Sequence, residues 1–458
     1  MRLKLSTAVL LSALLLLSAC ASNLPNVKGL NETQVTGPPV IKSAQGTLPP
    51  AQSQAIIGKL EKESGSTDIL QHQVKLMENI SGRPLFAGNK ATLLEGGAEA
   101  YAAMLKAIGK AKDSINLETF IFDGDKTGKE FASALLKKRA EGVQVNVIYD
   151  SVGSMHTPAS FFQRMREGGI NVLEYNPVNP FKVRKKWLIT HRDHRKILVV
   201  DGKVAFTGGV NISGVYRSIL NEKDEKKTQN PWRDTHVMIQ GPAVAEFQRL
   251  FLTTWKWQAG PKLPERDYFP KLGKEGGDYV MVVSNHPGEY NRLTYIMYYT
   301  AFGNAQDYIH LTSSYFIPDK ETIKALTDAA RRGVDVELVL PNESDVPIAF
   351  YAGRSYYTRL LKAGVRIFLR KDTVLHAKTA VIDGVWSPVG STNMDMWSFA
   401  KNNEVNAVII GTDFAGEMEA MFEQDLSHSK EIRPEDWEKR PLFKKIRDSL
   451  ANLLKWWL

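Results

Sequence analysis

One stretch of this sequence occurs twice, and its two copies are separated by a constant distance. Both follow the pattern H-x-K-x4-D, then six residues, then G-[GS]-x-N. The matched residues are His194 and His376, Lys196 and Lys378, Asp201 and Asp383, and Asn211 and Asn393, and each pair is 182 positions apart. Four positions that share one offset are difficult to obtain by chance. The sequence therefore predicts two similar halves, each supplying one half of a site.

Each copy has the pattern of a β-strand whose polar end carries the site. In the first copy an apolar run at 197–200 follows His194 and Lys196, and Asp201 with Gly202 predicts the turn that ends the strand. Residues i and i+2 of a strand project from the same face, so the imidazole and the ammonium group should lie side by side. This pair suits a phosphate, because lysine holds charge and histidine acts as nucleophile or proton carrier near neutral pH.

The asparagines that end the two copies extend the same interpretation. Asn211 and Asn393 can donate hydrogen bonds to phosphoryl oxygens, and the glycines before them let the backbone approach a ligand. We therefore expect both asparagines to bind phosphate.

Further segments allow a family to be recognised. They are residues 115–121, 149–154, 232–236, 315–319 and 403–406. Together with the repeated motif, they make the sequence resemble the phospholipase D superfamily and, within it, the bacterial cardiolipin synthases. The similarity runs from about residue 82 to residue 432. It implies an α/β fold: two similar phospholipase D-like sandwich halves related by a pseudo-twofold axis, with the active site at their interface.

The resemblance also implies a reaction. A phosphatidyl group would pass between two phosphatidylglycerol molecules through a phosphohistidine, giving cardiolipin and glycerol. The catalytic residues it implies are His194, Lys196, Asp201, His376, Lys378 and Asp383. Family habit favours His194 as the nucleophile. Hydrolysis of a phospholipid to phosphatidic acid is the alternative, and cleavage of nucleic-acid phosphodiesters is a weaker one.

No cofactor is implied, and we expect no metal. His191 and His194 have the H-x-x-H spacing of some metal sites, but residues three apart on a strand face opposite ways. No additional cysteine or acidic cluster completes a ligand set.

Two acidic residues are expected to orient the histidines. When residues 221–230 are treated as an insertion, the segment at 232–239 aligns with the one at 402–409, and Asp234 falls opposite Glu404. A carboxylate on the far nitrogen of an imidazole fixes its tautomer. We expect Asp234 to pair with His194, and Glu404 with His376; strand-edge carboxylates with structural partners are the alternative.

The first residues resemble a lipoprotein signal. A basic start is followed by a short apolar run at 8–17 and then by Leu17-Ser-Ala-Cys20, which resembles the lipobox of bacterial lipoproteins. By that resemblance Cys20 would be cleaved free and acylated, and the protein would face the periplasm. Ala21 favours the outer over the inner membrane. An uncleaved signal-anchor helix is the alternative.

The organisation expected along the chain follows from these features. We expect a signal peptide over 1–19, a flexible tether over 20–52, an N-terminal helical element over 53–88 that docks on the first half, the first half over 89–265, the second over 266–432, and a C-terminal helix over 433–458.

The C-terminal segment has the pattern of a helix that lies in a membrane surface. Its apolar residues recur at helical spacing, and basic residues occupy much of the other face. A helix packed on the protein body is the alternative. The formal net charge of +9 suits an anionic partner. With the acyl anchor, these features favour phospholipid and a membrane surface as partners over nucleic acid.

Overall fold

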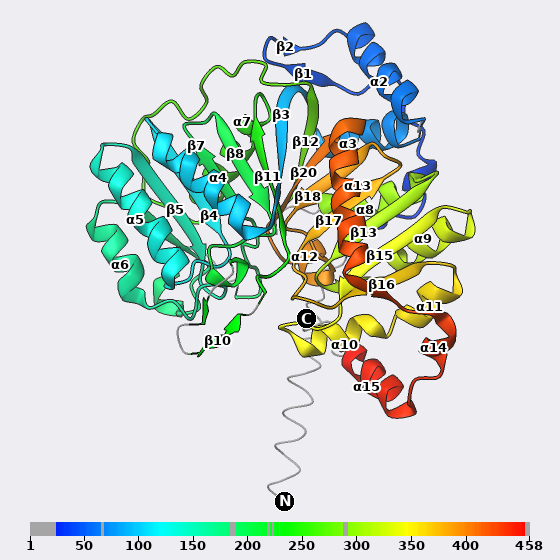
Figure 1. Ribbon diagram of the computed structural model, residues 1–458. Coiled ribbons are helices and arrows are strands. Elements are labelled where there is room, and N and C mark those ends of the chain that lie inside the picture. Colours follow the sequence, from blue (N-terminus) through cyan, green and yellow to red (C-terminus); the bar gives the residue numbers. More distant parts are fainter. Residues whose placement is uncertain are drawn as a thin grey trace, which may run out of the picture.

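The computed structural model describes residues 24–65, 68–183, 189–217, 220–221, 224–228, 230–286 and 292–453. Two α/β halves lie side by side, each built on a mixed β-sheet (Figure 1). This is the fold class that the sequence predicts. Within the described ranges, no helix has both the length and the apolar character needed to cross a membrane.

The first half contains a sheet in the order β6-β5-β4-β7-β8-β11-β3. Only β4, β5 and β6 run parallel to one another. The strands are β3 (Leu85–Glu95), β4 (Ser114–Thr119), β5 (Gln144–Asp150), β6 (Asn171–Tyr175), β7 (Ile197–Val200), β8 (Val204–Gly208) and β11 (Thr235–Gln240).

The second half repeats this plan as β12-β20-β18-β17-β13-β15-β16-β21. Its strands are β12 (Asp278–Asn285), β13 (Tyr308–Ser313), β15 (Asp335–Pro341), β16 (Arg366–Arg370), β17 (Lys378–Ile382), β18 (Trp386–Gly390), β20 (Glu404–Ile410) and β21 (Ser429–Glu431). Strand β3 also pairs with β12, so the two sheets are joined edge to edge.

Each sheet is covered by helices on one face and meets the other half through the other face. The covering helices are α4 (Gly96–Lys110), α5 (Lys126–Ala140) and α6 (Ala159–Glu167) in the first half, and α8 (Leu293–Asn304), α9 (Lys320–Arg331) and α11 (Tyr357–Lys362) in the second. A central core between the halves includes α7 (Val244–Trp257) and α13 (Thr412–Ser427). Strand β7 shows the resulting alternation: Ile197 and Val199 face this central core, whereas Leu198 and Val200 face the core under α4 and α5.

The N-terminal segment differs from the expected tether. Val27 and Ile41 are buried in the core of the second half, and β1 (Ile41–Ser43) pairs with β3. The segment is polar in composition, but these apolar side chains are enough to fix it on the body.

The helical element that follows is present but docks elsewhere than expected. It consists of α2 (Pro50–Ser64), η2 (Asp68–Gln73) and α3 (Val74–Ser81), and β3 already begins at Leu85. It packs on the second half, where Gln73 Nε2 donates to the Met297 carbonyl of α8 at 3.0 Å. The prediction that it docks on the first half is therefore wrong, because amphipathic spacing shows that a face is buried but not against what.

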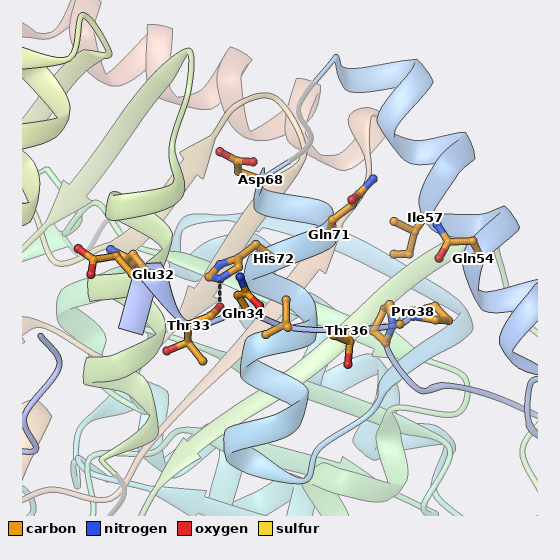
Figure 2. Close-up of a pocket in the computed structure, with 14 residues that line it drawn as sticks. Glu32, Thr33, Gln34, Thr36, Pro38, Gln54, Ile57, Asp68, Gln71 and His72 are labelled. Carbon is orange, nitrogen blue, oxygen red and sulfur yellow. Dashed lines mark hydrogen bonds between the residues drawn. The ribbon is translucent and has the colours of Figure 1, made fainter. Parts of the chain in front are cut away.

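A cleft of about 470 Å³ lies where this N-terminal segment crosses α2 and η2 (Figure 2). His72 closes one side through its Nε2 contact with the Thr33 carbonyl oxygen at 2.8 Å. The cleft is lined by residues 31–39 together with Gln54, Ile57, Asp68, Gln71 and His72, and no residue of the repeated motif takes part. The cleft is thus a seam between packed segments, away from the site that the sequence predicts.

Candidate active site

The two histidine–lysine pairs lie at the starts of equivalent strands. His194 and Lys196 immediately precede β7, and His376 precedes Lys378, the first residue of β17. All four side chains are buried, with at most 7% of each residue exposed. The strand ends thus place both halves of the repeated motif at the same end of the two sheets.

Backbone hydrogen bonds join the two half-sites across the interface. The His194 N–H donates to the Asn403 carbonyl at 3.1 Å, and the His376 N–H donates to the Arg233 carbonyl at 2.7 Å. Isolated parallel bridges connect Asp193 with Asn403 and Leu375 with Arg233. Each histidine is therefore anchored to the residue that precedes the acidic residue of the opposite half.

The acidic residues consequently contact the histidines in a crossed arrangement. Asp234 Oδ2 accepts from His376 Nδ1 at 2.7 Å, and Glu404 lies 3.1 and 3.2 Å from His194 Nδ1 through its two oxygens. The expectation that Asp234 pairs with His194 and Glu404 with His376 is wrong. The alignment of Asp234 with Glu404 is sound, but the strands that carry them lie at the interface, so each carboxylate reaches across it.

These contacts determine which nitrogen faces a substrate. A carboxylate at Nδ1 keeps the proton there and leaves the Nε2 lone pair available. Among the described residues, none makes a hydrogen bond with Nε2 of His194 or with Nε2 of His376. Burial, and next the charge of Lys378, lower the pKa of His376 to about 4, while burial and Lys196 lower the pKa of His194. Both imidazoles are therefore neutral near pH 7.

The carboxylate of Asp234 remains ionised despite its burial. Burial pushes its pKa upward, but the pairing of this carboxylate with His376 outweighs the effect and holds the pKa below its usual value. An imidazolium formed during a reaction would thus find a negative charge already in place.

The two lysines have strongly perturbed ammonium groups. Burial lowers the pKa of Lys196 to about 7 and that of Lys378 to about 8, although nearby carboxylates oppose this change. Lys196 Nζ donates to the His194 carbonyl at 2.6 Å, and Lys378 Nζ donates to the His376 carbonyl and, at 2.8 Å, to Ser314 Oγ. Two cations held at low polarity favour an anion between them.

The half-sites differ in how each carboxylate is supported. Ser391 Oγ donates to Glu404, whereas the equivalent position holds Gly209. A Cβ at Gly209 would lie 2.0 Å from Asp234 Oδ1. The shorter aspartate therefore requires glycine beside it, and the longer glutamate accommodates a serine that adds a hydrogen bond.

The asparagines lie next to the histidine–lysine pairs rather than at a distance. Asn211 accepts from the Ile121 N–H at 3.1 Å and donates to Tyr216 Oη at 2.9 Å, and this oxygen lies 3.2 Å from His376 Nδ1. Asn393 Oδ1 accepts from Ser314 Oγ at 2.7 Å, the same hydroxyl that accepts from Lys378. The sequence did not single out Tyr216 or Ser314, since the repeated motif contains neither of them.

Aromatic rings flank the histidines. Phe120 lies edge-on to His194 with ring centroids 5.1 Å apart, and Trp232 and Tyr315 lie 5.5 and 6.3 Å from His376. Phe120 and Tyr315 follow equivalent strands, β4 and β13, but at different positions. Tyr315 matches Ile121, because their carbonyls accept from the N–H groups of Met394 and Ile212, which are 182 positions apart. Comparison of the two halves therefore does not single out both rings.

Asp201 and Asp383 lie at the opposite ends of their strands from the histidines. Asp201 accepts hydrogen bonds from the N–H groups of residues 112–114, and Asp383 accepts from those of residues 306–308. Four residues of strand separate Lys196 from Asp201, so the two are roughly 15 Å apart along the chain. The structure does not bring either aspartate to the site, and the expectation that they are catalytic is replaced by a structural role.

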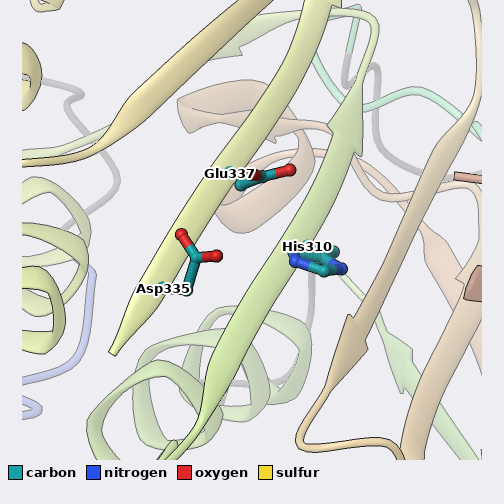
Figure 3. A group of neighbouring side chains, drawn as sticks. All are labelled: His310, Asp335 and Glu337. Atoms are coloured by element: carbon teal, nitrogen blue, oxygen red, sulfur yellow. The ribbon is translucent and has the colours of Figure 1, made fainter. Parts of the chain in front are cut away.

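Within the part of the chain that the structure describes, one group of potential metal ligands lies outside the site. His310, Asp335 and Glu337 lie close together on β13 and β15 (Figure 3). Glu337 is paired with Arg366, and His310 Nδ1 lies 2.8 Å from Glu419. Two of the three side chains are thus already engaged by other partners. Cys20, the expected lipidation site, lies outside the described residues.

Comparison with known proteins agrees with this geometry. A family model described as "Cardiolipin synthase, PLD-like domain" matches residues 104–229 and 298–426, one segment in each half. The crystal structure of phosphatidylserine synthase from Haemophilus influenzae Rd KW20 has the same fold, with a TM-score of 0.60 and 16% identity over 84% of this chain and 99% of that one. The chain is thus a phosphatidyltransferase of the phospholipase D superfamily.

Curated relatives narrow the class further. Cardiolipin synthase of Geobacillus kaustophilus is 34% identical over 384 residues, which cover 83% of this chain and 75% of the relative. Cardiolipin synthase A of Pseudomonas syringae pv. syringae is 35% identical over 365 residues, covering 78% and 73%. The chain belongs to the cardiolipin synthase family.

Proposed function

We propose that the chain transfers a phosphatidyl group from one phosphatidylglycerol molecule to a hydroxyl of a second, releasing glycerol and forming cardiolipin. The observation that carries this proposal is the crossed pair of histidines, each with Nδ1 held by a carboxylate and Nε2 left for the substrate. The names of the curated relatives supply the substrate class.

In the first step His194 Nε2 attacks the phosphorus of the donor lipid. A P–N bond forms, the P–O bond to the glycerol headgroup breaks, and the departing oxygen takes a proton from His376. This requires a protonated His376, although its pKa is lowered to about 4 in the free protein. The negative charge of a bound phosphodiester raises this pKa and so supplies the proton donor only when substrate is present.

In the second step the roles of His376 reverse. Now neutral, it takes the proton from the hydroxyl of the second lipid, and that oxygen attacks the phosphorus and breaks the P–N bond. Lys196 and Lys378 stabilise charge on the non-bridging oxygens, and Asn211 and Asn393 contribute from beside them. No step requires a metal or a cofactor.

The membrane attachment is also a proposal. Acylation of Cys20 would tether the chain to a membrane facing the periplasm, with Ala21 favouring the outer membrane, and the C-terminal segment would add a second attachment. Mass spectrometry of the N-terminal peptide from protein made in a bacterial host tests the anchor. An unmodified Cys20 preceded by residues 1–19 would contradict it.

Product analysis tests the reaction itself. Purified protein would be given phosphatidylglycerol in mixed micelles, with His194→Ala and His376→Ala as controls. We expect cardiolipin and glycerol in equal amounts, both absent in the variants. Phosphatidic acid alone would show that water is the acceptor, and turnover of DNA but not of lipid would reject the proposal.

A further inference from the structure

The last helix of the described chain packs on the body with its apolar side outward. Helix α15 (Leu442–Leu453) exposes Leu442, Phe443, Ile446, Leu450 and Leu453, each with 50–73% of its surface accessible. Asp448 and Ala451, on the opposite side, are buried. A helix on the surface of a soluble protein normally buries its apolar stripe and exposes its charges. Here that arrangement is reversed.

Polar contacts hold the helix in this orientation. Asp448 carboxylate oxygens lie 3.1 Å from Arg447, 3.6 Å from Arg354 of α10 (Pro347–Arg354) and 3.9 Å from Arg440. The hydroxyl of Tyr356 donates to the side chain of Asn452 at 2.9 Å. Buried ion pairs fix the rotation of a helix, so the outward stripe is a defined surface.

The stripe continues onto the neighbouring helix. An open groove between α10 and α15 is lined by Pro347, Ile348 and Tyr351 on one side and by Phe443, Ile446 and Leu450 on the other. Contiguous exposed apolar surface of this kind marks an interaction site.

The first half adds exposed apolar side chains at the same end of the molecule. Met155 follows β5, Val178 and Phe181 follow β6, Ile189 precedes the His194 segment, and Val215 follows β8. Phe181 is 97% exposed. Parallel strands β4, β5 and β6 end at this edge, where antiparallel β7 begins, and α10 and α15 lie at the corresponding edge of the second half (Figure 1). The apolar side chains thus surround the end that carries His194 and His376.

Among the described residues, the one large exposed apolar side chain away from this end is Phe269. Its neighbours Tyr268 and Pro270 lie against Gly202, at the far end of β7 from His194. The distribution is therefore one-sided rather than a general property of the surface.

The charge on this surface indicates what covers it. Asp448, the one acidic residue of α15, is buried in its arginine contacts, whereas Lys444 is exposed and Lys445 half-buried. Lys182 is exposed beside Phe181. Lysines beside exposed apolar side chains match the boundary between anionic headgroups and acyl chains.

We propose that the end of the molecule formed by α10, α15 and the loops with Met155, Phe181 and Val215 is a docking face for an anionic phospholipid bilayer. Helix α15 lies in the plane of the headgroups with its apolar stripe among the acyl chains, and the two histidines face the lipid. This deepens the proposed function, on which it rests for the nature of the substrate, but docking can be measured without turnover.

The first test is a local probe in the full-length chain with Cys20→Ser. An environment-sensitive fluorophore is attached at Ile446→Cys or, as the matched control, at Phe269→Cys. On addition of phosphatidylglycerol vesicles we expect a blue shift and a several-fold rise in emission at position 446 and no change at 269. An anchor elsewhere in the chain cannot produce this difference. Equal responses at both positions, or none at 446, would overturn the proposal.

The second test separates docking from chemistry. Ile446→Asp with Leu450→Asp should lower turnover of phosphatidylglycerol in vesicles by about tenfold or more and leave turnover of a monodisperse short-chain phosphatidylglycerol unchanged. Phe269→Asp should change neither. Loss of both activities, or dimers that depend on α15 and no vesicle binding, would count against a membrane face. A His194→Ala protein that still shows the signal at position 446 would show that docking stands even if the proposed reaction fails.

Discussion

At the residue scale, each histidine of the repeated motif is held by one carboxylate of the other half. Without that carboxylate the imidazole loses the partner that keeps the proton on Nδ1, and the wrong nitrogen faces the substrate. The short contact between Asp234 and His376, 2.7 Å, makes this dependence direct. The same holds for Glu404 and His194 at 3.1 Å.

We predict that Asp234→Asn and Glu404→Gln each lower kcat by about 10²–10⁴-fold, because each leaves the site packed but removes the fixed tautomer. Histidine ¹⁵N NMR shows which ring is affected. Asp234→Asn should move the signals of His376 and not those of His194, and Glu404→Gln should do the reverse. A response of His194 to Asp234→Asn would instead support pairing within each half.

The two lysines predict an alkaline limit to activity. Their pKa values are lowered to about 7 for Lys196 and about 8 for Lys378, so the free protein loses positive charge as the pH rises through this range. We expect kcat/KM to fall between about pH 7 and 8. A bound phosphodiester favours the charged lysines, so the fall in kcat should occur at higher pH. Identical pH limits for kcat and kcat/KM would contradict this assignment.

At the scale of elements, the two ends of each repeated strand differ. The histidine and lysine lie at the start of the strand, and the aspartate lies just after its end. Asp201 closes this end of β7 by accepting from three successive N–H groups at the start of β4. We predict that Asp201→Ala lowers the free energy of unfolding by about 1–3 kcal/mol, since three backbone N–H donors, two of them partly buried, lose their acceptor. The folded variant should keep its kcat. Urea titration with activity assays checks both, and a collapse of kcat at unchanged stability would restore a catalytic role for Asp201.

Strand β11 carries a buried histidine, His236, that the proposed reaction does not use. His236 is buried, neither ring nitrogen has a hydrogen-bond partner among the described residues, and burial lowers its pKa to about 3. The unfolded chain takes up this proton near pH 6.5, so the stability that neutral His236 supports is present above that pH and is lost as the pH falls toward 3.

Replacing His236 should therefore flatten the acid dependence of stability. We predict that the free energy of unfolding of His236→Leu falls less steeply between about pH 6 and 4, by about 1.4 kcal/mol per pH unit. Denaturant titrations at several pH values measure this slope. Since His376 titrates over part of the same window, His376→Gln provides a comparison, and a slope unchanged by His236→Leu would show that this ring stays unprotonated for another reason.

The strands and helices of both halves could be predicted because their periodicity is local. The strand expected over 197–200 is β7 (Ile197–Val200), and the turn expected after it lies at Asp201 and Gly202. The crossed contacts of Asp234 and Glu404 could not, because local sequence does not record how two finished sheets meet. The same reason explains why the element at 53–88 was assigned to the wrong half.

At the scale of the whole molecule, neither half contains a complete site. The first half supplies His194 and the carboxylate for His376, and the second supplies His376 and the carboxylate for His194. In the proposed reaction, two chemically different steps use this one pair of histidines, which the interface holds in a fixed relation. The two halves of this single chain are arranged like the two subunits of a symmetric dimer.

The central claim is that a covalent phosphohistidine forms in this shared site. The most direct measurement is rapid quenching with phosphatidyl-p-nitrophenol, a substrate whose leaving group needs no proton, followed by mass spectrometry of the histidine peptides. We predict an adduct on His194 in the unaltered protein, none in His194→Ala, and an adduct that accumulates in His376→Ala, because the base for the second step is missing. Absence of any adduct while nitrophenol is released, or an adduct in His194→Ala, would contradict the account.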